Sequence, residues 1–420
     1  MFSSQILLFS LLLWSSIAES LAIPRSNDPR KYIVQLSSST NLLSHIRNNS
    51  FLTHAGTAGI GKENLQGTDG TIERVYSIGN FTAYLGSFNA DIAKELSASA
   101  DVKQLFPDDM FRVGIEDINL EYGQAVKQSG IYEQQAPASW GLASISSKDL
   151  FWDDATYKAP LPLGRGVKVY VVDTGVYTEH PEFEDNRAVK GANFVSDESD
   201  EDLNGHGTFV SGIIAGALSG IAKDAKIIAV KAFNSRGFSS YSSILAAFEW
   251  IYNNHNSADR ALINYSAGGR DPYGIMDPII EELFSVGLNF VRAAGNEGVD
   301  ACSYIGYNEL AITAGSFDIN GNRDDFSNYG ECVDIWAPGK QIISANSRYK
   351  DGDSYFTTKS GSSFSCAHVS GVAAVFLVHG VFPQGLKSSV LGFGIRNQLG
   401  RMDTSDTNLR LYNNLDGFSG

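Results

Sequence analysis

The sequence predicts an α/β protein: a mainly parallel sheet flanked by helices, preceded by a smaller α+β unit. Three observations support this fold class. From about residue 136 onward, short apolar runs alternate with segments of helical spacing. The clearest run, Val167–Val172, is largely apolar and β-branched, as expected for a strand buried on both faces. Before it, residues 23 to about 133 contain strand-like and helical segments but neither a cysteine nor a cluster of catalytic residue types.

Composition limits the classes of function. The chain has 420 residues, 43% of them hydrophobic and 19% charged, which is ordinary for two or three globular domains. Its 42 glycines favour many tight turns. A net charge of −15 argues against nucleic acid as a partner, because a phosphate backbone requires a basic surface. The same charge suits a soluble extracellular protein, and we expect a monomer.

The N-terminus predicts a signal peptide over residues 1–22. The apolar run Ile6–Trp14 is too short to span a bilayer. It is followed by small-x-small cleavage patterns at Ala18–Ser20 and Ser20–Ala22. A buried N-terminal helix is the alternative. No later segment has the roughly 18 apolar residues of a membrane helix, so we expect a secreted, extracellular protein without a membrane anchor.

The smaller unit is predicted over residues 23–133. A Gly-, Ser-, Thr- and Asn-rich stretch, Thr53–Thr71, indicates a loop within it. The polar stretch Glu121–Gln135 is interpreted as a linker and a cutting site, so the larger domain is assigned to residues 134–420. The elements expected in the smaller unit are strands at Lys31–Leu36, Phe81–Phe88 and Val102–Phe106 and a helix at Ala90–Ala98.

The larger domain shows the alternation of an α/β sheet. Its expected strands are Val167–Val172, Ile227–Ala232, Ala261–Tyr265 and Leu288–Ala293, and its expected helices are Gly207–Ala217, Ser243–Asn253 and Ser363–His379. Such alternation predicts helices on both faces of the sheet. Ligands of open α/β sheets bind beyond the carboxyl ends of the strands, which directs attention to the residues found there.

Three polar residues lie at such junctions. Asp173 directly follows the first strand, His206 begins a helix between two glycines, and Ser363 begins the long Ala- and Val-rich helix. Each alone has an ordinary structural interpretation, as a turn Asp, a core His and a helix-capping Ser. Together they form the set that acyl transfer by serine needs: a nucleophile, a base and a carboxylate that orients the base.

The chain order Asp, His, Ser excludes two common serine hydrolases. In α/β-hydrolase esterases the serine comes first, and in chymotrypsin the histidine comes first. Ser365 also stands where the esterase motif Gly-x-Ser-x-Gly needs a glycine. A serine esterase of another fold is therefore disfavoured. The order found here is the one that subtilisin has.

The larger domain resembles the subtilisin family, and most closely its proteinase K branch. The matching segments are Val172–Gly175, Gly205–Thr208, Ser266–Gly269, Ala293–Asn296, Phe326–Gly330, Ala337–Gly339 and Gly361–Ser363. The likeness covers nearly all of residues 136–390. The stretch from Tyr32 to Val113 resembles, more loosely, the inhibitory propeptide of that family. The resemblance implies a subtilisin-like fold preceded by a ferredoxin-like propeptide.

The resemblance also implies residue roles. Asp173 would orient His206, the general base, and Ser363 would attack the scissile carbonyl. Asn296 would donate its side-chain amide to the oxyanion. The substrate would be a protein or peptide that pairs as a strand between two segments of the enzyme, and the enzyme's own propeptide would act as its inhibitor. The pairing residues would be Ser266, Ala267 and Gly268 on one side and Gly237, Phe238 and Ser239 on the other. Broad cleavage with apolar or aromatic P1 residues is expected.

Several positions depart from the family pattern. Phe209 replaces a histidine, Phe364 replaces the methionine after the nucleophile, Ala367 stands where a proline is usual, and Ser239 replaces a glycine. These changes predict a more crowded cleft. They leave open a second hypothesis, a non-enzymatic binding module of the same fold, which the intact set of catalytic residues disfavours. Arg292, in an apolar strand, has no explanation from the sequence.

The three cysteines, Cys302, Cys332 and Cys366, predict one disulfide and one free thiol, since the count is odd in a secreted protein. Related enzymes carry a pair at similar spacing, which implies a Cys302–Cys332 bridge. Two sequons, at Asn48 and Asn80, are candidate glycosylation sites.

No cofactor is expected for the chemistry, although the resemblance implies a structural calcium site. Its oxygen ligands would be Asp318 and the backbone carbonyls of Glu309 and Ala311. A solvated loop Asp is the alternative interpretation of Asp318.

Overall fold

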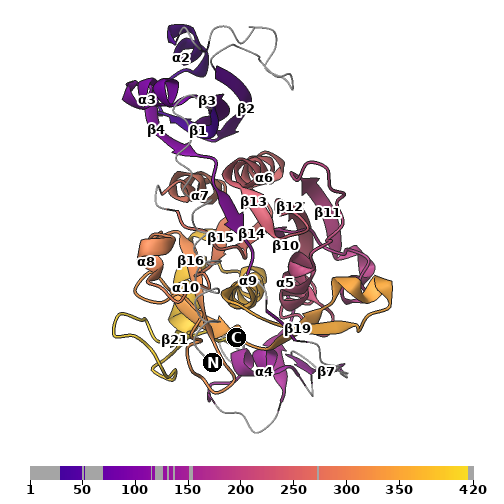
Figure 1. Cartoon of the computed structure of the whole chain (residues 1–420). Helices are drawn as coiled ribbons and strands as arrows, with labels where there is room; N and C mark the ends of the chain where they lie inside the picture. The colour runs from indigo at the N-terminus through magenta and orange to yellow at the C-terminus, as the bar shows by residue number, and fades with distance from the viewer. Residues whose placement is uncertain are drawn as a thin grey trace, which may run out of the picture. The chain divides into compact units, whose positions relative to one another are not determined.

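A computed structural model describes residues 29–49, 52, 70–114, 116–118, 126–129, 132–135, 138–150, 155–271 and 274–414. The chain forms two compact units (Figure 1). One comprises the residues up to Val75 together with Thr82–Asp108, and the other comprises Tyr76–Phe81 and Asp109–Gly420. The predicted signal peptide, residues 1–22, lies outside the described residues.

The first unit is a four-stranded sheet with two helices (Figure 1). The strand order is β2-β3-β1-β4, with β1 antiparallel to both β3 and β4. Its core includes Val34, Tyr84, Phe88 and Leu96, from two strands and one helix. The predicted ferredoxin-like α+β fold is confirmed. The elements are β1 (Arg30–Leu36), α2 (Leu42–Asn48), β2 (Gly70–Ile78), β3 (Phe81–Phe88), α3 (Ala90–Ala98) and β4 (Val102–Pro107).

The second unit contains a large sheet whose order among the described strands is β11-β12-β10-β14-β15-β16-β17-β21-β20. All pairs are parallel except the last, β21 with β20. The strands are β10 (Val167–Asp173), β11 (Ala188–Asn193), β12 (Lys226–Lys231), β14 (Arg260–Tyr265), β15 (Asn289–Ala293), β16 (Ala311–Phe317), β17 (Ile335–Pro338), β20 (Ile395–Arg396) and β21 (Leu409–Arg410). The predicted mainly parallel sheet is confirmed.

Helices cover both faces of this sheet. The core cluster that contains residues of α5 and α9 takes Val169 and Val171 from β10 and no described residue of α6, so α5 and α6 lie on opposite faces. Helix α9 packs against α5, and α6 contacts α7 (Figure 1). The helices of this unit are α4 (Trp140–Ser146), α5 (His206–Ala215), α6 (Tyr241–Asn254), α7 (Met276–Ser285), α8 (Ala301–Tyr304), α9 (Ser362–Val378) and α10 (Leu386–Phe393).

The reversal of direction at β10 creates a crevice at its carboxyl end. The chain leaves β10 for β11, beyond β12 on one side, and later passes β10 again to reach β14 on the other side. Such a switch point is where open α/β sheets bind ligands. Asp173, the last residue of β10, lies there, and the chain following β14 begins with Ser266.

The polar stretch interpreted as a linker is partly strand. Residues Val126–Ser129 form β7 and Tyr132–Gln135 form β8, which pairs antiparallel with β9 (Tyr157–Pro160). The buried Gln135 amide donates to the carbonyl of Leu218. The boundary predicted at residues 133/134 therefore cuts through a strand of the second unit, which begins at Asp109. A polar strand at a sheet edge lacks the apolar alternation that marks strands in sequence.

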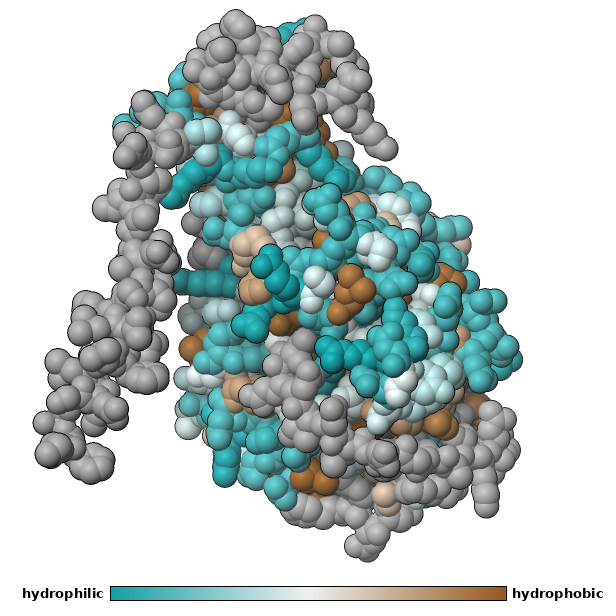
Figure 2. All heavy atoms as spheres, turned by 45° about the vertical axis from the view of Figure 1, so that its right-hand side comes forward, coloured by the Kyte–Doolittle hydropathy of each residue, from teal (hydrophilic) through white to brown (hydrophobic). Residues whose placement is uncertain are grey.

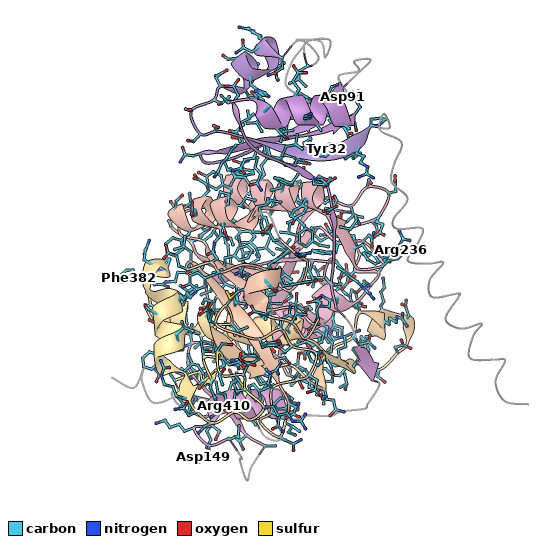
Figure 3. The ribbon with its side chains drawn as sticks, turned by 60° about the vertical axis from the view of Figure 1, so that its left-hand side comes forward. Tyr32, Asp91, Asp149, Arg236, Phe382 and Arg410 are labelled. Carbon is cyan, nitrogen blue, oxygen red and sulfur yellow. A yellow bond between two sulfur atoms is a disulfide. The ribbon has the colours of Figure 1, made fainter. Side chains whose placement is uncertain are left out.

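Five further short strands form two small sheets outside the large one. Strand β5 (Met110–Arg112) pairs with β13 (Phe238–Ser240), and β19 (Phe356–Ser360) pairs with both β6 (Glu116–Ile118) and β18 (Ile342–Ala345). On the face drawn in Figure 2, hydrophilic side chains predominate and hydrophobic ones form small separate patches. Phe382, near α10, points outward and is 78% exposed (Figure 3). Among the described helices, none is long and apolar enough to cross a membrane.

Candidate active site

Asp173 and His206 form a fully buried pair at the carboxyl end of β10. The Nδ1 atom of His206 lies 2.8 and 2.9 Å from the two carboxylate oxygens of Asp173. His206 is the first residue of α5, and Gly207 lets the helix approach the preceding strand end. A Cβ atom at Gly207 would overlap the carbonyl oxygen of Gly175, so only glycine fits there.

A hydrogen-bond network that the sequence did not indicate holds this pair. Asp202 is buried and accepts hydrogen bonds from Thr174 Oγ1 at 2.8 Å and from Thr208 Oγ1 at 2.6 Å. The Thr174 hydroxyl oxygen in turn accepts from the Gly207 N–H at 3.0 Å. Asp202 thus ties the loop after β10 to the first turn of α5. It lies in an acidic, loop-like stretch, where pattern alone does not distinguish a buried carboxylate from solvated ones.

Ser363 lies in the first turn of α9 and is 1% exposed. Its hydroxyl donates to the carbonyl of Ser266 at 2.8 Å, and the Ser266 hydroxyl donates to the carbonyl of Ser363. The Nε2 atom of His206 is buried and makes no hydrogen bond within the described part of the chain. The structure therefore has the Asp–His hydrogen bond, with the serine hydroxyl turned to another acceptor. Catalytic hydrogen bonds are often long or misaligned without substrate.

The two phenylalanines that depart from the family pattern pack behind the histidine. Phe209 and Phe364 are both fully buried, with ring centroids 4.6 Å apart. The Phe364 ring also lies 5.7 Å from that of His206. The two substitutions therefore fill one space in the core together.

Asn296 follows β15 and faces the start of α9. Its Oδ1 atom accepts a hydrogen bond from the Ser362 N–H at 2.7 Å, which fixes the amide and directs Nδ2 the other way. A Cβ atom at Gly114 would overlap that Nδ2, so the backbone of Gly114 closely approaches the amide nitrogen. In this orientation the Asn296 Nδ2 could donate a hydrogen bond to the carbonyl oxygen of a residue that occupies the position of Gly114.

The segment from Met110 to Gly114 lies between the two strands that were predicted to bind substrate. Strand β5 pairs antiparallel with β13, so that Ser239 lies opposite Phe111. The backbone N–H and C=O of Arg112 exchange hydrogen bonds with Gly268, each 3.2 Å long. The Val113 N–H donates to the carbonyl of Gly237 at 3.0 Å. Residues of the chain itself thus take the extended, strand-paired conformation expected of a substrate.

A cavity of about 560 Å³ opens beside this segment. Glycines 268 and 269 form part of its wall, and Asn296, Glu297, Tyr304 and Phe326 are among its lining residues. Burial, together with the neighbouring Glu297 carboxylate, raises the pKa of Tyr304 to about 12, so the phenol stays protonated. Phe111 instead inserts its ring against Tyr241, with centroids 4.3 Å apart.

The cysteines are placed as predicted. Cys302 and Cys332 form a disulfide. Cys366 is a free, fully buried thiol on α9, and burial raises its pKa to about 12. The thiol is therefore held in its unreactive protonated form.

The three predicted calcium ligands do not form one site. Ala311 begins β16, whereas Asp318 follows its last residue, so the two lie about 20 Å apart at opposite ends of the strand. The Asp318 carboxylate accepts backbone N–H groups of its own turn, from Asn320 and Asn322. A single ion cannot bind residues at both ends of a strand, so the set of Asp318, Glu309 and Ala311 is wrong as one site.

The two predicted sequons are accessible. Asn48 at the end of α2 and Asn80 in the turn after β2 are both exposed.

Comparison with known proteins agrees with this geometry. The sequence profile of the subtilase family matches residues 164–387, and that of the peptidase inhibitor I9 family matches residues 31–113. A solved structure of a cold-adapted subtilisin-like serine proteinase superposes with a TM-score of 0.60 at 35% identity, covering 66% of this chain and 99% of that one.

Curated relatives extend the similarity over most of the chain. A subtilase-type proteinase of the sexual differentiation process from Schizosaccharomyces pombe is 36% identical over 338 residues, which span 78% of this chain and 68% of the relative. Subtilisin-like protease 2 of Trichophyton tonsurans is 34% identical over 401 residues, spanning 89% and 88% of the two chains. The chain belongs to the subtilase family and is a serine endopeptidase made as a zymogen with an I9-type propeptide.

Proposed function

We propose that Ser363 is the nucleophile, that His206 is its general base and later the general acid, and that Asp173 orients and stabilises the imidazole. The buried Asp173–His206 pair, with Ser363 at the start of α9 in the same crevice, carries this assignment. Rotation of the serine hydroxyl away from the Ser266 carbonyl would bring its proton to the unpaired Nε2 of His206. Attack then forms the acyl-enzyme, which water hydrolyses.

In this proposal the oxyanion is stabilised by Asn296 Nδ2 and by the backbone N–H of Ser363. The Asn296 amide is preorganised because its oxygen is held by the Ser362 N–H. Donors that are fixed before the reaction stabilise developing charge without reorganisation. The N-terminal end of α9 adds the favourable field of its unsatisfied N–H groups.

We further propose that the first cut of the precursor falls between Gly114 and Ile115. Residues 110–113 pair with both substrate-binding strands, and Gly114 lies against the Asn296 amide. The placement of residues 110–114 along these strands supports a cut directly after Gly114. Within the predicted cutting stretch Glu121–Gln135, the described strand β8 pairs with β9 of the second unit.

The purified precursor tests this proposal. N-terminal sequencing after incubation should identify a new chain that begins at Ile115, although a later trim within residues 119–125 would shorten it further. The Ser363→Ala precursor purified alone should stay uncut. Processing of that variant without added peptidase would overturn self-cleavage, and a first cut elsewhere would overturn the Gly114 assignment.

The substrate is proposed to be an extended protein segment of broad sequence with an apolar or aromatic P1 side chain. Backbone pairing with Gly237 and Gly268 carries no side-chain information, which favours breadth. The glycine walls and Phe326 of the cavity suit a flat apolar group. Glu297 on the same cavity wall favours the alternative, a basic P1 residue.

A matched peptide series with Phe, Leu, Lys or Arg at P1 separates the two. The largest kcat/KM for Phe or Leu supports the proposal. A preference for Lys or Arg that disappears in Glu297→Gln would replace it with the alternative.

Secretion and glycosylation are also proposed. The short apolar run at Ile6–Trp14 with its following small residues supports export, and the exposed Asn48 and Asn80 sequons support glycan attachment. Mass spectrometry of the protein recovered from the medium tests both. Recovery only inside the cell, or an unmodified mass, would contradict them.

A further inference from the structure

Three oxygen atoms at the amino-terminal edge of the large sheet converge on one ammonium group. Lys387, in the first turn of α10, places Nζ 2.6 Å from the carbonyl oxygen of Ala311 and 2.9 Å from Oδ1 of Asp334. The carbonyl oxygen of Asn308 is 3.3 Å away. An ammonium has three donors, so each oxygen can receive one. The side chains of Lys387 and Asp334 are only 18% and 11% exposed.

This oxygen set has the chemistry of a cation site. Backbone carbonyls and a carboxylate are the ligands that Ca²⁺ takes. The carboxylate here is Asp334, which precedes β17 and whose Oδ2 accepts the Thr313 N–H at 2.8 Å. The Tyr307 ring lies 5.8 Å from Nζ and adds a π face. The predicted Ala311 carbonyl thus does face a cation, but the cation is a side chain of the protein.

A second cationic side chain binds the same loop. The buried guanidinium of Arg292, on β15, donates to the carbonyls of Ile305 and Gly306 at 3.1 and 2.7 Å and to Thr313 Oγ1 at 3.0 Å. This accounts for a charge that the sequence left unexplained. Arg292 and Lys387 together satisfy carbonyls of the loop that connects α8 to β16.

The loop they bind begins at a wall of the substrate cavity. Tyr304 ends α8, lines that cavity and precedes the first carbonyl bound by Arg292. The position of the loop therefore bears on the shape of the cavity.

We propose that Lys387 is an internal substitute for a metal ion: its ammonium holds Asn308, Ala311 and Asp334 together, so that this loop needs no calcium. Removing the ammonium should leave a ready set of oxygens that binds a divalent or trivalent hard cation. A simple surface ion pair predicts no such gain of binding, because losing it leaves solvated groups.

The test uses the full chain carrying Ser363→Ala, which prevents self-digestion, and adds Lys387→Met. Methionine keeps the apolar stem and removes only the charge. In chelator, the melting temperature of the Lys387→Met protein should fall by about 2–6 °C relative to the Ser363→Ala parent. Millimolar calcium chloride should restore most of that loss and leave the parent unchanged. Lys168→Met, which breaks the more exposed Lys168–Asp259 pair, is the matched control and should not respond to calcium.

Terbium provides a readout of binding itself. Tyr307 is close enough to sensitise Tb³⁺ luminescence in the Lys387→Met protein, and adding Asp334→Asn should abolish the signal. Lys387→Ala is a second variant should the methionine impair folding.

Either of two results would overturn the proposal. One is a Lys387→Met protein, or its alanine equivalent, that gains neither calcium-dependent stability nor Tb³⁺ luminescence. The other is a parent whose own stabilisation by calcium disappears in Asp334→Asn.

Discussion

Two carboxylates at opposite edges of one parallel sheet, the fully buried Asp173 and the largely buried Asp334, have different partners. Asp173 ends β10 at the carboxyl edge and pairs with the imidazole of His206, which carries a second ring nitrogen. Asp334 precedes β17 at the amino edge and pairs with Lys387, whose ammonium has hydrogen-bond donors only. A carboxylate that orients an imidazole can support proton transfer at the second ring nitrogen, whereas one that binds an ammonium holds neighbouring segments together. The first edge carries the proposed chemistry and the second carries stability.

Within the described part of the chain, the surroundings of the Asp173–His206 and Asp334–Lys387 pairs also differ: the first has an unpaired polar atom and the second has all donors paired. At the carboxyl edge, His206 Nε2 has no partner among the described residues, so one position remains open for reaction. At the amino edge, each Lys387 proton has an oxygen acceptor. Burial raises the pKa of Asp334 even though Lys387 and Arg292 oppose the shift, so the carboxylate depends on its cations.

The largest expected effect is at the carboxyl edge. Ser363→Ala should lower kcat/KM by about 10⁶-fold, because it removes the proposed nucleophile. The melting temperature should stay within about 1 °C, because the substitution removes only the hydrogen bond from the Ser363 hydroxyl to the Ser266 carbonyl and introduces little strain. Activity is measured on a processed chain obtained by adding a trace of active peptidase to the precursor. Substitution of an exposed serine on α10, Ser388→Ala, is the control. An active Ser363→Ala chain would contradict the assignment of the chemistry to the carboxyl edge.

Asn296→Asp sharpens the comparison within the same edge. Aspartate keeps an oxygen for the Ser362 N–H but loses the Nδ2 donor, so kcat should fall by about 10²–10³ with little change in KM. In Asn296→Ala, kcat should fall by a similar factor, and the protein should also be less stable. A smaller effect on kcat than on KM would assign Asn296 to substrate binding instead.

The disulfide should affect stability and not chemistry. Cys302 and Cys332 are separated by 30 residues, and closing such a loop contributes about 3.5 kcal/mol in the chain-entropy model. The Cys302→Ser/Cys332→Ser protein should lose about that free energy of unfolding in denaturant titrations while kcat is retained. Cys366→Ser, at the free thiol, is the comparison variant. A loss of kcat with unchanged stability would reverse the expectation.

The smallest expected effect is a loss of stability at acidic pH. His368 on α9 is fully enclosed, and burial lowers its pKa to about 4 from an unfolded value near 6.5. Because the unfolded chain binds the extra proton first, stability is complete above pH 6.5 and falls as pH decreases toward 4, by up to about 3 kcal/mol. The decline should be shallower in His368→Asn. An equal pH slope in the two proteins would show that His368 is not the responsible group.

Sequence patterns predicted the carboxyl edge well because its signals are local. Asp173, His206 and Ser363 each lie at a junction between a strand or loop and the next element, and apolar runs mark the strands. The departures at Phe209 and Phe364 were visible as substitutions, but their mutual packing was not, since the two residues lie on different helices.

The amino edge was predicted poorly because its contacts join distant segments. Lys387 contacts Asp334 and Ala311, which lie 53 and 76 residues earlier in the sequence, and no local sequence pattern predicts contacts over such separations. The calcium assignment rested on the family resemblance and failed at Asp318, because Asp318 lies at the opposite end of β16 from Ala311. Strand β8 was missed because its residues are polar.

Covalent labelling tests the central claim most directly. A fluorophosphonate reacts with a serine only when that serine is activated by a base and an oxyanion site. After processing, peptide mapping of the labelled chain should locate a single adduct on Ser363, and His206→Ala and Ser363→Ala should each abolish it. An adduct on another serine, or undiminished labelling in His206→Ala, would contradict the account.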